Sequence, residues 1–207
     1  PGQKYLKTKV AENGIYRISV NELSQAGLDT SNVKGDHIQV WNFGKQIPVF
    51  VSNSNTLSSN DYLEFYGEKL TIGFDSLLFV DWKNEMLNTE YSFVTDSNTY
   101  VVTFDSSSVN LRYETVIPDY ENESPTPLDY YIHEDKQVFT DIFYKIQHGE
   151  TQYSNFEAAE GWAKKGEKET NTLFELKDYQ NNGIAARIGA RLSSTIFFSR
   201  LLINVNN

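Results

Sequence analysis

Residues 5–18 read YLKTKVAENGIYRI, and this stretch indicates the class of the fold. Its first six residues alternate between polar and apolar side chains, as a half-exposed β-strand does. A second short run at residues 15–18 follows the pair Asn13-Gly14. Asn-Gly between two such runs is a strong hairpin signal. We therefore expect a β-hairpin over residues 4–18.

One short helix is expected directly after this hairpin. Ser19 is a suitable N-cap, and Glu22 stands three residues later, as a capping box requires. Gly27 stands where a helix usually ends with a residue of positive φ. Val20 and Leu23 share one side of this helix, so we expect it to pack on the sheet.

The rest of the chain predicts strands and loops. Its 13 Tyr, 13 Phe and 3 Trp favour a sheet-rich fold, since aromatic side chains suit a half-buried pleated surface. Pro48 restricts its strand to an edge or a late start. Polar residues 52–60 predict an exposed loop, and residues 68–90 have no regular pattern. The expected strands lie at residues 38–41, 47–51, 61–67, 100–104, 111–116, 130–132, 139–146, 173–177, 184–192 and 196–205.

These patterns predict an all-β protein with one short helix and two domains. Residues 1–116 form a mixed-sheet N-terminal domain, and residues 117–129, with three prolines among polar residues, form a linker. Residues 130–207 predict a β-sandwich or jelly-roll-like domain. Because a strong strand nearly reaches the last residue, we expect this domain to be truncated.

Composition excludes several classes of function. The net charge of −10 argues against nucleic acid and against anionic membranes as partners. The absence of cysteine removes disulfides, thiolate metal sites and a cysteine nucleophile. No apolar run reaches the roughly 18 residues of a membrane span.

Catalytic chemistry has no recognisable sequence pattern. No Gly-x-Ser-x-Gly, His-Glu-x-x-His or phosphate-binding glycine motif occurs. The histidines, at positions 37, 133 and 148, are too scattered for a zinc pair or a triad. Carboxylates are frequent, as in any acidic protein. Two sets are the candidates for a calcium site or a glycosidase cleft: Glu64 with Glu68, and Asp75 with Asp81 and Glu85. We expect no catalytic residue, no metal site and no cofactor.

One aromatic side chain is a candidate for ligand binding. Trp162 stands in a polar, loop-like stretch, Glu160-Gly161-Trp162-Ala163, and its indole is suited to stacking on a sugar ring. The alternative is that it fills a sandwich core. The two interpretations differ in whether the ring is exposed.

Several segments together resemble the N-terminal region of gingipain-type proteins (peptidase family C25), and most closely the PorU-like sortases of the type IX secretion system of Bacteroidetes. The resemblance covers residues 5–104. It lies in residues 5–10, 12–18, Leu23 and Gly27, 38–44, 47–49, 61–67 and 95–100, with Val94 where such proteins usually have Tyr. Residues 130–207 resemble the following sandwich more loosely, at residues 160–162 and 201–206.

The resemblance implies an exported or cell-surface protein in which the catalytic Cys and His lie in a later α/β domain. No catalytic residue can be transferred to this chain, which lacks Cys. The leading hypothesis is thus a non-catalytic accessory region that packs on the catalytic domain of the same protein or docks secretion-system proteins. A carbohydrate-binding sandwich is the first alternative, and a hydrolase using a carboxylate pair is the second.

Overall fold

The computed structural model describes residues 3–106, 110–117, 126, 128–146, 156–166, 173–174 and 185–193. The chain divides into two compact units. Unit 1 comprises Pro1–Leu70 and Thr95–Ser124, and unit 2 comprises Thr71–Val94 and Pro125–Asn207. Strands exceed helices, and the helices are few and short, so the all-β expectation is confirmed.

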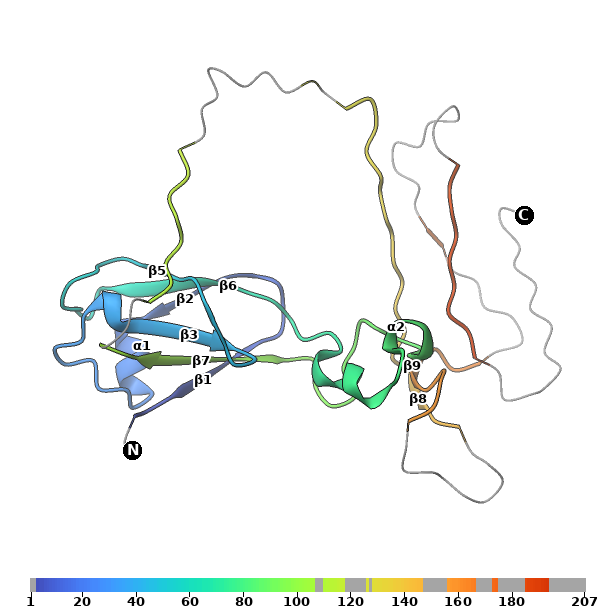
Figure 1. Ribbon diagram of the computed structural model, residues 1–207, viewed down its shortest axis with the longest axis horizontal. Helices are drawn as coiled ribbons and strands as arrows, with labels where there is room; N and C mark the ends of the chain where they lie inside the picture. The colour runs from blue at the N-terminus through green and yellow to red at the C-terminus, as the bar shows by residue number, and fades with distance from the viewer. Residues whose placement is uncertain are drawn as a thin grey trace. The chain divides into compact units, whose positions relative to one another are not determined.

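Unit 1 is a sandwich of two antiparallel sheets (Figure 1). Sheet A has the order β1 (Leu6–Val10), β7 (Asn98–Phe104), β3 (Ile38–Asn42) and β4 (Lys45–Ile47). Sheet B has the order β2 (Gly14–Ser19), β6 (Tyr62–Gly67) and β5 (Phe50–Val51). Each strand pair in these sheets is antiparallel, so the expected mixed sheet is replaced by two antiparallel layers.

The core of unit 1 lies between the two sheets. Alternate residues of β6, Leu63 and Phe65, are fully buried, and they meet the inward residues of sheet A, such as Val40 and Val102. Burying a side chain of this size contributes roughly 1.5–3 kcal/mol. The buried cluster consists of Val10, Val20, Leu23, Leu28, Ile38, Val40, Val49, Leu57, Leu63, Phe65, Tyr100 and Val102.

The hairpin expected over residues 4–18 is wrong. β1 pairs with β7 and β2 pairs with β6, so the chain passes from sheet A to sheet B between them. Neither Asn13 nor Gly14 has positive φ, which a two-residue hairpin turn of type I′ requires. The Asn13 side chain instead accepts a hydrogen bond from the Lys69 amide, 2.8 Å away, and holds the exit of β6.

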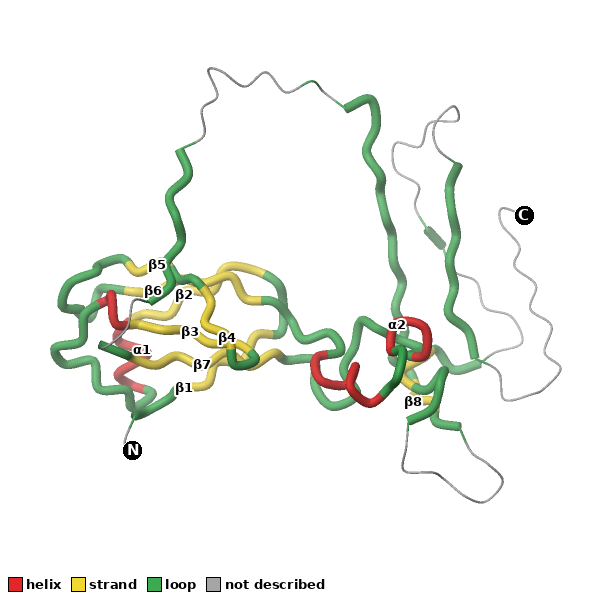
Figure 2. Tube along the Cα trace, in the orientation of Figure 1, coloured by secondary structure: helices red, strands yellow, loops and turns green. Residues whose placement is uncertain are grey.

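The helix expected after Ser19 is confirmed as α1 (Val20–Gln25), shown in red beside the strands of the sandwich in Figure 2. The capping box is complete, since the Glu22 amide donates to the Ser19 hydroxyl and the Ser19 amide donates to the Glu22 carboxylate. Gly27, at φ 93°, donates to the Ser24 carbonyl, and Leu28 donates to the Leu23 carbonyl. This pair of bonds is a Schellman motif, and it places Leu28 in the core.

The strand expected at residues 47–51 is divided between the two sheets. β3 and β4 form a hairpin whose loop residues, Phe43 and Gly44, both have positive φ. β4 then ends before Pro48, and β5 begins in sheet B after Val49. Because Pro48 cannot donate to a ladder, the change of sheet occurs there. The strand expected at 111–116 is reduced to a bridge between Val49 and Arg112.

The polar loop between β5 and β6 is held by one carboxylate. Asp61 accepts hydrogen bonds from the Ser52 hydroxyl, from the side-chain amide of Asn53, and from both the backbone amide and the hydroxyl of Ser58. These donors lower the pKa of Asp61, those from Ser58 most. The loop also lies against Gly35, whose amide donates to the Asn55 carbonyl.

Unit 2 has little regular structure among its described residues. It contains η2 (Gly73–Leu78), α2 (Trp82–Glu85), and one antiparallel pair, β8 (Ile142–Tyr144) and β9 (Gly161–Ala163). Its small core joins Ile72, Phe79 and Met86 to Phe93 and Phe156. Arg191 donates to the carbonyls of Lys83 and Met86 at the end of α2.

The division of the chain differs from the one expected at residues 1–116, 117–129 and 130–207. Residues 71–94 belong to unit 2 because their aromatic side chains pack there, with the Phe93 and Phe156 rings stacked at 5.1 Å. Residues 130–132, 173–174 and 185–192 form no strand, and 196–205 lie outside the described residues. The sandwich expected in 130–207 therefore stays a prediction. In the described residues, no helix is long and apolar enough to cross a bilayer.

Candidate docking surface

The outer surface of sheet B carries an unusual number of exposed aromatic rings. Leu63 and Phe65 of β6 face the core, so the alternate residues of β6 and their cross-strand partners face outward. We call this surface the aromatic face; it consists of Ile15 and Arg17 from β2, Tyr62, Glu64 and Tyr66 from β6, Phe50 from β5, and Tyr113. Phe50 is 44% exposed, Tyr66 46%, Tyr113 43% and Ile15 65%.

An ion pair lies at the centre of the aromatic face. The Arg17 guanidinium is 2.7 Å from the Glu64 carboxylate, directly across the β2–β6 ladder. The same guanidinium stands over the Tyr62 ring, 4.1 Å from its centre. The hydrogen bond to Glu64 raises the pKa of Arg17. Arg17 is therefore directed towards Glu64 and Tyr62, although its side chain remains 61% exposed.

Tyr113 reaches the aromatic face from a segment outside both sheets. The Tyr66 amide donates to its hydroxyl at 2.9 Å, on the side of β6 away from β2. Arg112 anchors this segment by donating to the carbonyls of Gly35 and Ile38, and burial lowers the pKa of its guanidinium. The Tyr113 ring is thus positioned by the bond from the Tyr66 amide to its hydroxyl, and by the bonds from Arg112 to the backbone carbonyls of Gly35 and Ile38.

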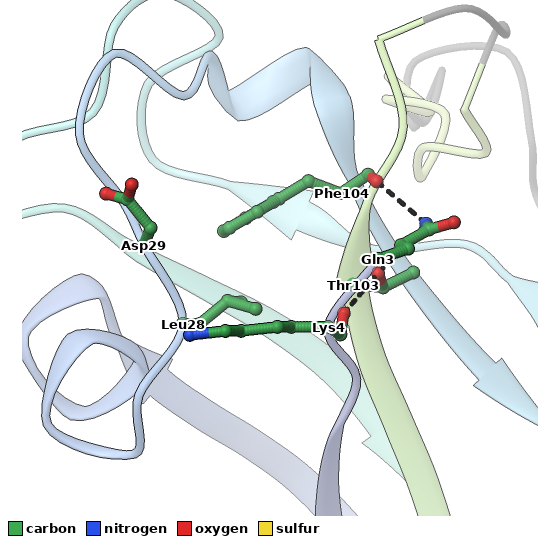
Figure 3. Close-up of a pocket in the computed structure, with 6 residues that line it drawn as sticks. All are labelled: Gln3, Lys4, Leu28, Asp29, Thr103 and Phe104. Atoms are coloured by element: carbon green, nitrogen blue, oxygen red, sulfur yellow. Dashed lines mark hydrogen bonds between the residues drawn. The ribbon is translucent and has the colours of Figure 1, made fainter. Parts of the chain in front are cut away.

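A shallow hollow of about 310 Å³ lies at another part of unit 1 and is lined by Gln3, Lys4, Leu28, Asp29, Thr103 and Phe104 (Figure 3). Its polar groups bond within the protein. Lys4 donates to the Gly27 carbonyl at the end of α1, and Gln3 donates to Thr103 and to the Phe104 carbonyl. Asp29 accepts a hydrogen bond from the Ser31 amide. Because these polar groups already have partners within the protein, the hollow is a weaker candidate than the aromatic face.

Comparison with family models, curated proteins and solved structures finds no match to this chain.

Trp162 does not present a free ring. It is half-buried on β9, and its indole N–H donates to the Ser92 carbonyl at 3.0 Å. Its ring meets Phe143 of β8 edge to face, with centres 5.2 Å apart. These contacts half-bury the ring and leave only part of it for a ligand, while the alternative that Trp162 fills a sandwich core stays a prediction.

The histidines and carboxylates singled out in the sequence do not come together as a common site among the described residues. His37 lies in η1 (Gly35–His37), His133 is exposed, and His148 lies outside the described residues. Among the residues that the structure describes, no three His, Asp or Glu side chains gather as metal ligands. Glu64 is paired with Arg17, Asp75 accepts from the Phe93 amide, and Asp81 and Glu85 bond to their own helix.

Sequence reasoning missed the aromatic face. The alternation in residues 61–67 was visible, but it did not show which set of side chains would face outward. Phe50 stood in an expected strand next to Pro48 and was assigned no role. The one available signal was that both alternating sets of β6 contain aromatic rings, so one set has to be exposed whichever way the strand turns.

Proposed function

We propose that this chain is a non-catalytic docking module that binds a protein surface through its aromatic face. The observation that carries the proposal is the grouping of Phe50, Tyr66 and Tyr113, each more than two-fifths exposed, around the Arg17–Glu64 pair. Tyr, Phe and Arg are the residue types enriched at the centres of protein interfaces.

The construction of the aromatic face suits binding. Its side chains stand on paired strands over a filled core, and the Arg17 guanidinium is already fixed by Glu64 and Tyr62. A surface that is ordered before binding loses less conformational entropy when a partner arrives.

A protein fits this surface better than a glycan. Sugar stacking needs open, roughly parallel rings, whereas the Phe50 and Tyr62 rings are inclined at 41°. Arg17 covers one side of the Tyr62 ring, and Ile15 adds an aliphatic side chain that a sugar platform does not need. A carbohydrate-binding sandwich is the less favoured alternative, and a glycan array with no bound sugar would remove it.

The partner that we propose is the catalytic domain of the same parent protein. The resemblance to gingipain-like cysteine peptidases and type IX sortases supports this choice, since those proteins place a β region ahead of the peptidase domain. It also supports an exported, cell-surface location. In this account the chain contributes no group to the reaction and acts by packing against the domain that does.

Substitution of the exposed rings tests the docking proposal. The double variant Phe50→Ser/Tyr66→Ser is expected to bind the separately produced peptidase domain of the parent about 30-fold or more weakly, since hot-spot rings typically contribute at least ~2 kcal/mol. Val94→Ser is the matched control because Val94 is apolar and 86% exposed in unit 2. Titration calorimetry or surface plasmon resonance gives the dissociation constants. Equal binding by the double variant and wild type, or no binding by wild type, would overturn the proposal.

A further inference from the structure

Among the described residues, the two sheets of unit 1 have four edge strands, and three of them are protected. β1 carries Lys7 and Lys9, while β4 and β5 are three and two residues long and flank Pro48. Lysines, short strands and prolines are the usual devices that keep sheet edges from pairing with other chains. β2 is different, since it is six residues long and has neither lysine nor proline, and its one charged side chain, Arg17, is paired with Glu64.

The ladder between β2 and β6 shows which backbone groups of β2 point away from the sheet. The Tyr66 amide donates to Tyr113, so the Ile15–Tyr66 pair is one that exchanges no hydrogen bonds across the ladder. The Val20 amide donates to the Asp61 carbonyl, and this pair lies two positions beyond Ile18–Leu63. Ile18–Leu63 is therefore a pair that exchanges hydrogen bonds, and Arg17–Glu64, like Ile15–Tyr66, is one that does not. The amides and carbonyls of Ile15 and Arg17 therefore point outward.

The next outward amide is already occupied. Ser19 donates its N–H to the Glu22 carboxylate in the capping box, so the helix closes that end of the edge. No strand among the described residues pairs with β2 on its outer side, since β2 stands at one end of the order of sheet B. Ile15 and Arg17, one on each side of Tyr16, together present two N–H donors and two C=O acceptors at this edge.

We propose that a second copy of this chain pairs antiparallel with β2 through these groups. Under a two-fold axis at Tyr16, Ile15 lies opposite Arg17 of the second copy, and Arg17 lies opposite its Ile15. Each of these two pairs exchanges two hydrogen bonds, which satisfies all the outward groups of both strands. The two three-stranded sheets B become one continuous sheet.

The side chains fit this arrangement. Each Arg17 stands beside an Ile15 of the other copy rather than beside the other Arg17, and it keeps its own Glu64 as counter-ion. The two aromatic faces then lie on the same side of the joined sheet, since outward residues of paired strands share a face. The dimer goes beyond the docking function and does not depend on which protein the aromatic face binds.

Charge sets the salt dependence of this pairing. Each chain has a net charge of −10, so the two copies repel at low ionic strength, and salt screens that repulsion. A contact made of backbone bonds and an apolar side chain has little attraction for salt to screen. Dimerisation is therefore expected to strengthen as salt is added.

Sedimentation velocity and amide hydrogen exchange on the full chain test the dimer. The expected result is a monomer–dimer equilibrium in which exchange at the Ile15 and Arg17 amides slows as concentration rises. Ile15→Pro removes one outward donor and no ladder bond, and should weaken dimerisation about tenfold or more. Ile15→Val keeps the donor and is the matched control, expected to behave as wild type.

Three results would overturn the dimer. They are a wild-type chain that stays monomeric at all concentrations and salt levels, a dimer unaffected by Ile15→Pro, and Ile15 and Arg17 amides whose exchange is independent of concentration. The exchange measurement uses only the wild type, so the test stands even if Ile15→Pro does not fold. Phe50→Ser/Tyr66→Ser should dimerise normally, which separates this proposal from the docking function.

Discussion

Gly35→Ala is expected to destabilise unit 1 by more than about 4 kcal/mol, which is an exceptional cost for adding one methyl group. A Cβ at this position would lie 1.8 Å from the Asn53 carbonyl oxygen and 2.9 Å from its carbon. The obstacle is backbone and cannot rotate away. Moving the loop away from η1 would also break two backbone hydrogen bonds, from the Gly35 amide to the Asn55 carbonyl and from the Asp36 amide to the Ser54 carbonyl. Urea denaturation followed by circular dichroism measures the loss.

The matched control for Gly35 is Gly14→Ala. A Cβ on Gly14 meets no atom within 4 Å, and Gly14 does not have positive φ. Its replacement in a strand should be neutral or slightly stabilising, since alanine restricts the unfolded chain. A Gly35→Ala protein as stable as Gly14→Ala would show that the loop at residues 52–60 does not lie against Gly35 as described.

Phe65→Ala is expected to lower the free energy of unfolding by about 3–5 kcal/mol. The Phe65 ring is fully buried and packs on Tyr16, with centres 5.9 Å apart, and on Tyr100 at 5.1 Å. It therefore joins both layers of the sandwich, and its removal leaves a cavity between β2, β6 and β7. Since a domain of this size is stable by roughly 5–15 kcal/mol, the variant should lose a large part of its stability.

Tyr66→Ala is the control for Phe65, because it removes a ring of similar size from the next residue of the same strand. Tyr66 faces outward and is 46% exposed, so the cost should stay below about 1 kcal/mol. Thermal melts of the two variants under identical conditions make the comparison. If Tyr66→Ala cost as much as Phe65→Ala, the inward and outward sides of β6 would be exchanged relative to this structure.

Local sequence signals predicted the local structures of this chain. The Ser19–Glu22 capping box and Gly27 predicted α1 because each bond that ends the helix joins residues a few positions apart. The turn after β3 is local in the same way, since Phe43 and Gly44 complete it without help from distant residues. Such features depend little on the rest of the fold.

The errors concern contacts between distant residues. Asn13-Gly14 was a strong hairpin signal, yet the pairing of β1 with β7, about 90 residues later, overrides it. Residues 68–90 have no regular pattern, and the core that Phe79 and Phe93 join includes the distant Phe156. Trp162 stands in a polar sequence, while the groups that cover it come from Phe143 and from the Ser92 carbonyl. The aromatic face follows the same rule, because the outward side of β6 is defined by sheet A.

The most direct test of the docking surface compares tyrosine reactivity in the isolated chain and in the proposed parent protein that includes the peptidase domain. Hydroxyl-radical footprinting with mass spectrometry reads Tyr66 and Tyr113 on the aromatic face, and Tyr5, 58% exposed and outside it, as the internal reference. The account predicts that labelling of Tyr66 and Tyr113 falls severalfold in the parent while labelling of Tyr5 is unchanged. Equal labelling of Tyr66 and Tyr113 in both proteins would contradict it.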